Sequence, residues 1–231
     1  MFELIRSFSD ERRKLKKLLQ GLDRETPVLD VGCGYGRNLL LMRQLGFTHL
    51  VGVEINPVLA AKVRAQGFKC YRPDEIERHD DRYGMLLMSH IVEHFEYVSL
   101  KAFLDRYLRC LRNSGTLVIA TPLFHDAFYN DFDHVKPYLP LGINMVFGAE
   151  AEQVQFQSER VLKLEAIEFF TDQLRVRFHP AIYKTGSQAW PIQLNRLLKL
   201  LFVLSGGVIG RKVGWIGRYR QLGPRSTGSH R

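Results

Sequence analysis

The chain has 231 residues, of which 45% are hydrophobic and 25% are charged, and its formal net charge is +9. This length suits one domain with an extension, whereas two full domains would be cramped. Charged residues are scattered through the N-terminal segment, so we expect no secretory signal peptide there. The cysteines Cys33, Cys70 and Cys110 lack metal-like spacing, and we expect them to be reduced thiols in a cytoplasmic protein.

The positive charge is concentrated in the last quarter of the chain. Residues 1–172 contain 22 of the 33 Lys and Arg residues and all 24 Asp and Glu residues. Residues 173–231 contain the other 11 basic residues and no acidic residue. Such a segment can bind an anionic partner, or it can simply keep the protein soluble, and the sequence leaves both interpretations open.

Taken in chain order, the sequence predicts strands that alternate with helices. A broken apolar stripe predicts a helix within residues 1–24. Apolar and β-branched runs predict strands at residues 28–31, 50–55, 68–71, 83–89 and 116–120. Helices are expected at residues 38–45, 57–66 and 100–111, with Ser99 as the N-cap of the third. This alternation predicts a Rossmann-like, doubly wound α/β fold, with a mostly parallel sheet of about seven strands and helices on both faces.

The second half of the chain is expected to complete this sheet and to end in an extension. Residues 161–169 and 174–178 predict two more strands, and residues 192–204 predict a helix. The positions beyond this helix are basic and loosely patterned. We therefore expect an N-terminal helix over residues 1–24, a central α/β domain over 25–180, and a basic C-terminal helical extension and tail over 181–231.

A glycine-rich loop follows the first expected strand and carries the strongest functional signal. Gly32, Gly34 and Gly36 allow sharp turns and a close approach of a ligand to the backbone, and the next helix offers free N–H groups. The spacing differs from that of dinucleotide-binding loops. Asp30 would repel a pyrophosphate but suits an amino group, and Glu54, at the end of the second strand, can accept both hydroxyls of a ribose.

Four motifs in order resemble the class I S-adenosylmethionine-dependent methyltransferases. They are V-L-D-V-G-C-G-Y-G (28–36), V-G-V-E-I-N-P (51–57), S-H-I-V-E-H (89–94) and L-R-N-S-G-T-L-V (111–118), and they cover about half of the chain. The resemblance implies that S-adenosylmethionine is the cofactor and that the central domain is a methyltransferase domain.

The same resemblance assigns roles to individual positions. The implied cofactor contacts are Asp30, Gly32, Cys33, Gly34, Gly36, Asn38, Glu54, Ile55, Ser89 and His90. Asp30 would hold the amino group, Glu54 the ribose, and Ile55 would flank the adenine. Ser89 and His90 would line the reactive end of the cofactor.

One motif has a competing interpretation. His90-Ile91-Val92-Glu93-His94 matches the H-x-x-E-H signature of a class of zinc peptidases. The segment follows a buried strand and does not lie in the middle of a long helix, so we expect no metal site. His94 is a candidate catalytic residue, with a packing or hydrogen-bonding role beneath the cofactor as the alternative.

The segment after the fifth strand is the candidate acceptor site. Residues 126–138 combine acids, aromatic residues and His134, and they resemble the Asp-x-x-His-Val-Arg-Pro stretch of methyltransferases from bacterial polysaccharide gene clusters. The resemblance implies O-methylation of a sugar or glycan-type acceptor. His134 is expected to act as the base or to position the acceptor, with Asp133 or Asp131 orienting it. The alternative is a structural loop histidine.

Several functional alternatives stay open. The core motifs also fit a methyltransferase of a small, quinone-like molecule. An RNA methyltransferase is possible in principle, but the chain has no recognisable RNA-binding module, so nucleic acid is not an expected partner. A fourth alternative is a non-catalytic scaffold that binds the cofactor.

The C-terminal helix leaves the choice of partner open. Its apolar and basic residues could lie on an anionic membrane surface, which would make this cytoplasmic protein peripheral to the inner face of the membrane. The same residues could pack on the sheet or on a second subunit of a homodimer. The segment is too short to span a bilayer.

Overall fold

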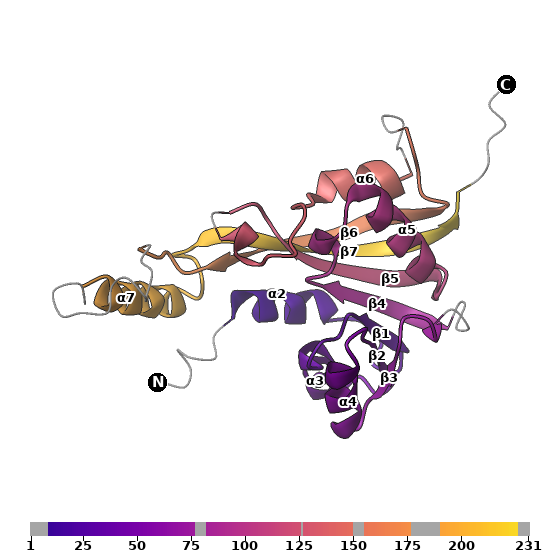
Figure 1. The fold of residues 1–231 in the computed structure, drawn as a ribbon, viewed down its shortest axis with the longest axis horizontal. Coiled ribbons are helices and arrows are strands. Elements are labelled where there is room, and N and C mark those ends of the chain that lie inside the picture. Colours follow the sequence, from indigo (N-terminus) through magenta and orange to yellow (C-terminus); the bar gives the residue numbers. More distant parts are fainter. Residues whose placement is uncertain (1–8, 77–81, 126, 150–154, 177–189, 226–231) are drawn as a thin grey trace.

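The computed structural model describes residues 9–76, 82–125, 127–149, 155–176 and 190–225. Seven strands form one sheet with the order β3-β2-β1-β4-β5-β7-β6 (Figure 1). The strands are β1 (Val28–Val31), β2 (Leu50–Val53), β3 (Lys69–Tyr71), β4 (Tyr83–Ser89), β5 (Leu111–Pro122), β6 (Arg160–Asp172) and β7 (Arg211–Pro224). Neighbouring strands are parallel from β3 to β5, whereas β7 runs antiparallel to both β5 and β6. The predicted fold class is confirmed.

Helices cover both faces of the sheet (Figure 1). The helices on the faces are α2 (Asp10–Leu19), α3 (Arg37–Gln44), α4 (Pro57–Ala65), α5 (Tyr97–Leu108) and α6 (Pro140–Phe147), whereas α7 (Trp190–Leu204) lies at the end of the β6–β7 pair. The buried apolar side chains form two cores. Helices α2, α3 and α4 contribute to one core, and α5 and α6 contribute to the other. Because side chains alternate along a strand, Leu86 of β4 packs into the α5–α6 core and Leu87 into the opposite one.

Local capping explains where two of these helices begin. The side chain of Asn56 accepts hydrogen bonds from the backbone N–H groups of Val58 and Leu59, and Pro57 opens α4 as the sequence predicts. Helix α5 begins earlier than expected, at Tyr97, with Glu96 at the N-cap position. The expectation that Ser99 caps this helix is therefore wrong, since Ser99 lies within its first turn.

The C-terminal segment supplies a strand that the sequence analysis missed. Strand β7 is inserted between β5 and β6 and buries Trp215 and Tyr219. On the same strand, Arg218 and Arg220 pair with Glu165 of β6. The expected loosely patterned tail is therefore wrong for residues 211–224, and the expected boundary at residue 180 does not separate this segment from the sheet.

The predicted strand at 174–178 is also wrong in the part that the structure describes. Residues 173–176 follow β6 without regular structure. Both backbone polar groups of Val176 bond to the side chain of Asn195 in α7, at 2.8 and 3.0 Å, so they join no sheet ladder. Residues 177–178 lie outside the described ranges.

Helix α2 is the described part of the expected N-terminal helix, whose first eight residues lie outside the described ranges. It packs on β6 and β7 and buries Leu15, Leu18 and Leu19. Its buried Asp10 accepts hydrogen bonds from the backbone N–H and the hydroxyl of Thr171, both at 3.0 Å. Within the described residues, no helix combines the length and hydrophobicity needed to cross a membrane.

Candidate active site

The candidate site lies at the end of the sheet that is formed by the carboxyl ends of the parallel strands. The register pairs Val31 with both Val53 and Met88, and Ser89 with Ala120. The residues that directly follow β1, β2 and β4 therefore meet at one edge. Carboxyl ends of strands in open α/β sheets are the usual place for a ligand.

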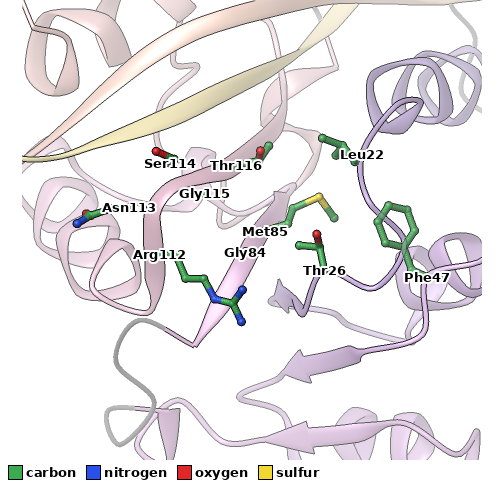
Figure 2. Close-up of a pocket in the computed structure, with 10 residues that line it drawn as sticks. All are labelled: Leu22, Thr26, Phe47, Gly84, Met85, Arg112, Asn113, Ser114, Gly115 and Thr116. Carbon is green, nitrogen blue, oxygen red and sulfur yellow. The ribbon is translucent and has the colours of Figure 1, made fainter.

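A pocket at the opposite end of the sheet, where the parallel strands begin, is a different feature (Figure 2). It measures about 230 Å³ and lies where β4 begins and beside the early part of β5. Its lining residues are Leu22, Thr26, Phe47, Gly84, Met85, Arg112, Asn113, Ser114, Gly115 and Thr116. Residues 112–116 of the fourth motif line it, but none of the expected cofactor contacts or acceptor-site residues does.

The glycine loop after β1 has a conformation that favours glycine at three positions. Gly32, Gly34 and Gly36 have φ angles of 68°, 54° and 76°. The backbone N–H groups of Gly32 and Cys33 donate to the carbonyl of Val53, which fixes the loop to β2. A Cβ atom on Gly32 would meet the Cδ1 atom of Ile91 at 2.1 Å, whereas nothing lies within 4 Å of a Cβ on Gly34. The loop is therefore closed on its inner side and open beside Gly34.

Asp30 is a buried acid on β1 that faces the candidate site. It is 1% exposed, and its Oδ2 atom has no hydrogen-bond partner among the described residues. Burial, together with the nearby charge of Glu54, raises the pKa of Asp30 to about 8. An unpaired buried carboxyl group is costly to a fold, and a cationic ligand would satisfy it.

Glu54 is held in place by the backbone. Its Oε2 atom accepts from the N–H of Gly34 and its Oε1 atom from the N–H of Asn56, both at 2.8 Å. Each carboxylate oxygen keeps a lone pair that can accept a ligand hydroxyl. The neighbouring Ile55 is 81% exposed, which is unusual for a large apolar side chain and leaves it free to contact a ring.

Two of the expected cofactor contacts, Cys33 and Asn38, are less accessible to a ligand. The Cys33 side chain is buried, and its Sγ atom lies 3.9 Å from the Sγ atom of Cys70. Burial raises the pKa of the Cys33 thiol, and the backbone N–H of Cys33 is bonded to Val53, so Cys33 is not placed for a direct polar contact with a ligand. Asn38 lies half-buried in the first turn of α3.

His90 is clamped between two acids at the end of β4. It is a non-glycine residue with a positive φ of 56°, and Ser89 precedes it as the last residue of the strand. Its Nε2 atom lies 3.0 Å from Oε1 of Glu11, and its Nδ1 atom lies 3.3 Å from Oε1 of Glu93. Burial opposes protonation, but the hydrogen bonds and charges of these acids outweigh it and raise the pKa of His90 to about 10.

Sequence reasoning missed Glu11, because no local pattern connects a residue of α2 to one that follows it by 79 positions. The clamp attaches α2 to the tip of β4. It also shows that the H-x-x-E-H motif forms no peptidase-like pair, since His90 faces Glu11 and Glu93 whereas His94 faces Asp133. The motif folds as a single 3₁₀ turn over Val92–His94 and not as part of a long helix.

Glu93 joins this turn to the candidate acceptor loop. Its side chain is fully buried, and its Oε2 atom accepts a hydrogen bond from the hydroxyl of Thr121 at 2.9 Å. Its backbone carbonyl accepts from the N–H groups of Val135 and Lys136, at 2.8 and 3.2 Å. The loop that carries His134 is thereby held against the end of β4.

The two histidines of the candidate acceptor site lie together. The ring centroids of His94 and His134 are 5.0 Å apart. The Nδ1 atom of His134 lies 2.7 Å from the carbonyl oxygen of Phe128, and its Nε2 atom lies 3.6 Å from Oδ2 of Asp131. Asp133 lies 3.3 Å from Nδ1 of His94. Among the two acids expected to orient His134, Asp131 is therefore placed to do so, and Asp133 pairs with His94 instead.

The acceptor loop also carries aromatic side chains, and one of them, Phe128, packs against His134. Phe124, Tyr129 and Phe132 are 68%, 60% and 103% exposed. Tyr129 packs edge-on against Phe128, and the Phe128 ring lies 4.7 Å from that of His134. Large exposed rings that cluster beside polar groups are typical of ligand sites.

The residues at the sheet edge fit S-adenosylmethionine. Asp30 offers a carboxyl group to the ammonium group, and the glycine loop gives the methionine moiety room beside Gly34. Glu54 has acceptors for the ribose hydroxyls, and Ile55 offers an apolar surface to the adenine. Ser89 and His90 lie where β4 ends, next to the acceptor loop.

Comparison with known proteins agrees with this fit. The sequence profile of a methyltransferase domain family matches residues 4–175. An S-adenosylmethionine-dependent methyltransferase from Archaeoglobus fulgidus is similar in structure, with a TM-score of 0.58 at 21% identity over 90% of this chain and 92% of that chain. A second one, from Mesorhizobium loti, has a TM-score of 0.57 at 14% identity over 94% of this chain and 99% of that chain.

No curated protein sequence matches the chain. The structural neighbours establish the fold, and the matched profile covers well over half of the sequence. The predicted family and enzyme class are confirmed. The chain belongs to the methyltransferase domain family, with the fold of the class I S-adenosylmethionine-dependent methyltransferases.

Proposed function

We propose that this methyltransferase transfers the methyl group of S-adenosylmethionine to a hydroxyl group of a sugar or glycan-type acceptor. The observation that carries this proposal is the pair His94 and His134 beside the end of β4, where the loop of His134 also carries the exposed aromatic residues Tyr129 and Phe132. Aromatic faces pack well against the apolar faces of sugar rings, and a hydroxyl group needs help in losing its proton.

S-adenosylmethionine supplies a methyl group on a positively charged sulfur, which leaves as a neutral thioether. The new bond joins the acceptor oxygen to the methyl carbon as the carbon–sulfur bond breaks, and the hydroxyl proton must go to a base. The hydrogen bond from Nδ1 of His134 to Phe128 leaves a lone pair on Nε2, which can take that proton. Asp131 then stabilises the charged ring.

His94 and Asp133 have a supporting role in this proposal. Asp133 fixes the His94 ring through both its backbone carbonyl and its carboxylate, each 3.3 Å from Nδ1. His94 can then hold the acceptor hydroxyl beside His134. Holding the reacting atoms in line is the main contribution an enzyme makes to a displacement of this kind.

The decisive experiment is acceptor profiling with the purified chain. S-adenosylmethionine would be supplied with free sugars, nucleotide sugars, lipid-linked glycan extract, catechol-type phenols or RNA, and release of S-adenosylhomocysteine would be measured. Methylation of a sugar hydroxyl supports the proposal. Transfer only to a phenol or to RNA would replace it, and cofactor binding without transfer to any acceptor would favour the scaffold alternative.

Two variants test the roles of the histidines. His94→Gln and His134→Gln should each lower kcat by roughly 10²–10⁴-fold, the usual range for loss of acid–base catalysis. Affinity for S-adenosylmethionine should stay within about twofold of the parent. His49→Gln is a matched control, because His49 is exposed and its ion-pair partner among the described residues is Glu25, far from the site.

We further propose that α7 places the enzyme on an anionic membrane surface. The exposed apolar side chains on α7 and the following turn are Trp190, Leu197, Leu201, Leu204, Val208 and Ile209. The helix lies at the end of the β6–β7 pair, apart from the helices on the two faces of the sheet (Figure 1). No acidic residue follows Asp172 in the sequence, so the charge of this end is complementary to anionic lipid.

Vesicle sedimentation tests this second proposal. The protein should bind vesicles that contain phosphatidylglycerol and should not bind vesicles of phosphatidylcholine alone. Binding should weaken with salt and in Leu204→Glu, whose parent side chain is 71% exposed. Equal weak binding to both vesicles would refute the proposal. A dimer in sedimentation velocity that Leu204→Glu dissociates would assign this face to a second copy of the chain.

A further inference from the structure

Three side chains at the acceptor site form a cluster that can hold a metal ion. One carboxylate oxygen of Glu93 and one ring nitrogen each of His94 and His134 all lie within 4.8 Å of one another. Two of these residues lie on the turn after β4, and the third comes from the loop after β5. The hydrogen bonds from Val135 and Lys136 to the carbonyl of Glu93 hold the two segments together. The cluster is therefore built by the backbone and is not a chance encounter of mobile side chains.

Both histidines are held in the form that binds metals. The Nδ1 atoms of His134 and His94 face carbonyl oxygens of Phe128 and Asp133, at 2.7 and 3.3 Å. A carbonyl oxygen only accepts hydrogen bonds, so each Nδ1 carries the proton and each Nε2 carries a free lone pair. Histidines that ligate metals characteristically donate their other ring N–H to a carbonyl or carboxylate in this way.

A second observation that favours a metal ion is the environment of the Glu93 side chain. Its side chain is 0% exposed, and its Oε1 atom is a buried oxygen without a hydrogen bond among the described residues. The nearest charged atom to Oε1 is Nδ1 of His90, 3.3 Å away. The other oxygen is already bound by Thr121. The ion pair with His90 uses only part of the acceptor capacity of this buried oxygen, so Oε1 keeps a lone pair that a metal ion can use.

We propose that Glu93, His94 and His134 bind a divalent transition-metal ion, which holds and acidifies the acceptor hydroxyl. Two imidazoles and one carboxylate are a ligand set that suits Zn²⁺, Mn²⁺, Fe²⁺ or Co²⁺. At ligand distances of about 2.0–2.2 Å, the three side chains must close in by about an ångström. Asp131, which lies 3.6 Å from Nε2 of His134, is available as a further ligand.

The metal ion changes the role of His134. With Nε2 on the metal, the ring no longer serves as the base, and the cation itself lowers the pKa of a bound hydroxyl. The hydroxyl proton then passes to Asp131 or to water. Binding of the ion requires only the three ligands and does not depend on the acceptor. Its catalytic role, in contrast, rests on the proposed function. The site uses Glu93 and His94 of the H-x-x-E-H motif, but His134 takes the place of His90, so the ligand set differs from that of the peptidases.

Metal binding can be measured without any acceptor. Tag-free protein would be stripped with EDTA and dialysed, and then titrated by calorimetry with ZnSO₄ and, separately, MnCl₂. We expect one ion per chain. His94→Gln and His134→Gln should each weaken binding at least tenfold, and His49→Gln should bind as the parent does. Failure of the folded parent to bind either ion, or equal binding by all four proteins, would overturn the inference.

Glu93→Gln is less straightforward, because Glu93 is buried and the variant could fail to fold. Its folding would be checked by circular dichroism and by binding of S-adenosylmethionine. A folded Glu93→Gln that has lost the ion supports the assignment, and one that binds it with the parent's affinity removes Glu93 from the site.

Activity measurements separate this inference from the proposed function. An ion that binds to a protein unable to methylate sugars would leave the metal site standing and refute the sugar acceptor. Sugar methylation that EDTA does not affect, in a protein that binds no ion, would overturn the metal site and leave His134 as the base. Sugar methylation that is lost with EDTA and restored by one of the two ions supports both.

Discussion

The carboxyl group of Asp30 on β1 and the carboxylate of Glu54 after β2 lie on neighbouring strands at one end of the sheet. Burial and this neighbouring charge raise the pKa of Asp30 to about 8, so Asp30 is protonated at neutral pH when no ligand is bound. The raised pKa of Asp30 leads to the first two predictions.

Asp30 should make the stability of the ligand-free protein fall as the pH rises. Its pKa in the folded state lies above the unfolded value of 3.8, so the folded protein binds more protons between about pH 4 and pH 8. At 1.36 kcal/mol for each pH unit, Asp30→Asn should gain up to about 4 kcal/mol over the parent between pH 5 and pH 8. Urea unfolding at both values would measure this. A difference between the two proteins that does not change with pH would contradict it.

Binding of S-adenosylmethionine should release a proton from Asp30. The ammonium group of the ligand favours the ionised carboxylate, so Asp30 should lose close to one proton per ligand bound at pH 6.5. Calorimetry in phosphate and in Tris, which differ in ionisation enthalpy, would give the number of protons released. The release should disappear in Asp30→Asn. Equal binding enthalpies in both buffers for the parent would show that Asp30 does not meet the ammonium group.

Glu54→Gln should weaken binding of S-adenosylmethionine by about 10–100-fold, which corresponds to about 1.4–2.8 kcal/mol. The change removes the charge that strengthens the hydrogen bonds to the ribose hydroxyls. Glu25→Gln is the control, since Glu25 is 67% exposed and lies beside His49. Both dissociation constants would come from calorimetry. Equal affinity in the two variants would remove Glu54 from the ribose site.

Asp10→Ala should destabilise the fold by about 2–3 kcal/mol. The change leaves the partly buried N–H of Thr171 without its acceptor and removes one of two acceptors near its hydroxyl, which keeps the carbonyl of Gly207 at 2.7 Å. It also removes the ion pair with Arg13. Asp74→Ala should cost less than about 0.5 kcal/mol, because Asp74 pairs with Arg72 on the surface. Thermal or urea unfolding would compare the two, and equal losses would show that the Asp10 contacts contribute little.

Removal of β7 should abolish folding. A chain that ends at residue 204 lacks the strand between β5 and β6, together with the buried Trp215 and Tyr219. A chain that ends at residue 225 keeps every contact described here and is the control. We expect the shorter chain to aggregate and the control to unfold cooperatively in urea with the parent's midpoint. A folded, soluble chain ending at residue 204 would mean that the sheet does not depend on β7.

The first five strands could be predicted because each is a short apolar run in a regular alternation with helices. Strand β7 gives no such signal. Arg218, Arg220 and three glycines dilute its apolar pattern, and the two arginines find Glu165 only when β6 lies beside them. Leu174–Val176 shows the reverse error, since apolar residues suggested a strand but the backbone of Val176 bonds to Asn195.

The cofactor half of the site was easier to predict than the acceptor half. Asp30 lies near the end of β1, and Glu54 directly follows β2. Their positions could be predicted because each strand is recognisable from its own local sequence. The partners of His90 and Glu93 depend on contacts between distant segments. Glu11 reaches His90 from α2, and Thr121 reaches Glu93 from β5. The sequence offers no pattern for such pairs.

The position of β7 also affects how the chain folds during synthesis. Strand β6 pairs only with β7 in the sheet, so it has no partner until residues 211–224 have left the ribosome. Until then β5 is an unprotected edge, and an exposed strand edge can pair with another chain. The sheet therefore cannot close before residues 211–224 have been synthesised, and in this interval a chaperone would be most useful to the nascent chain.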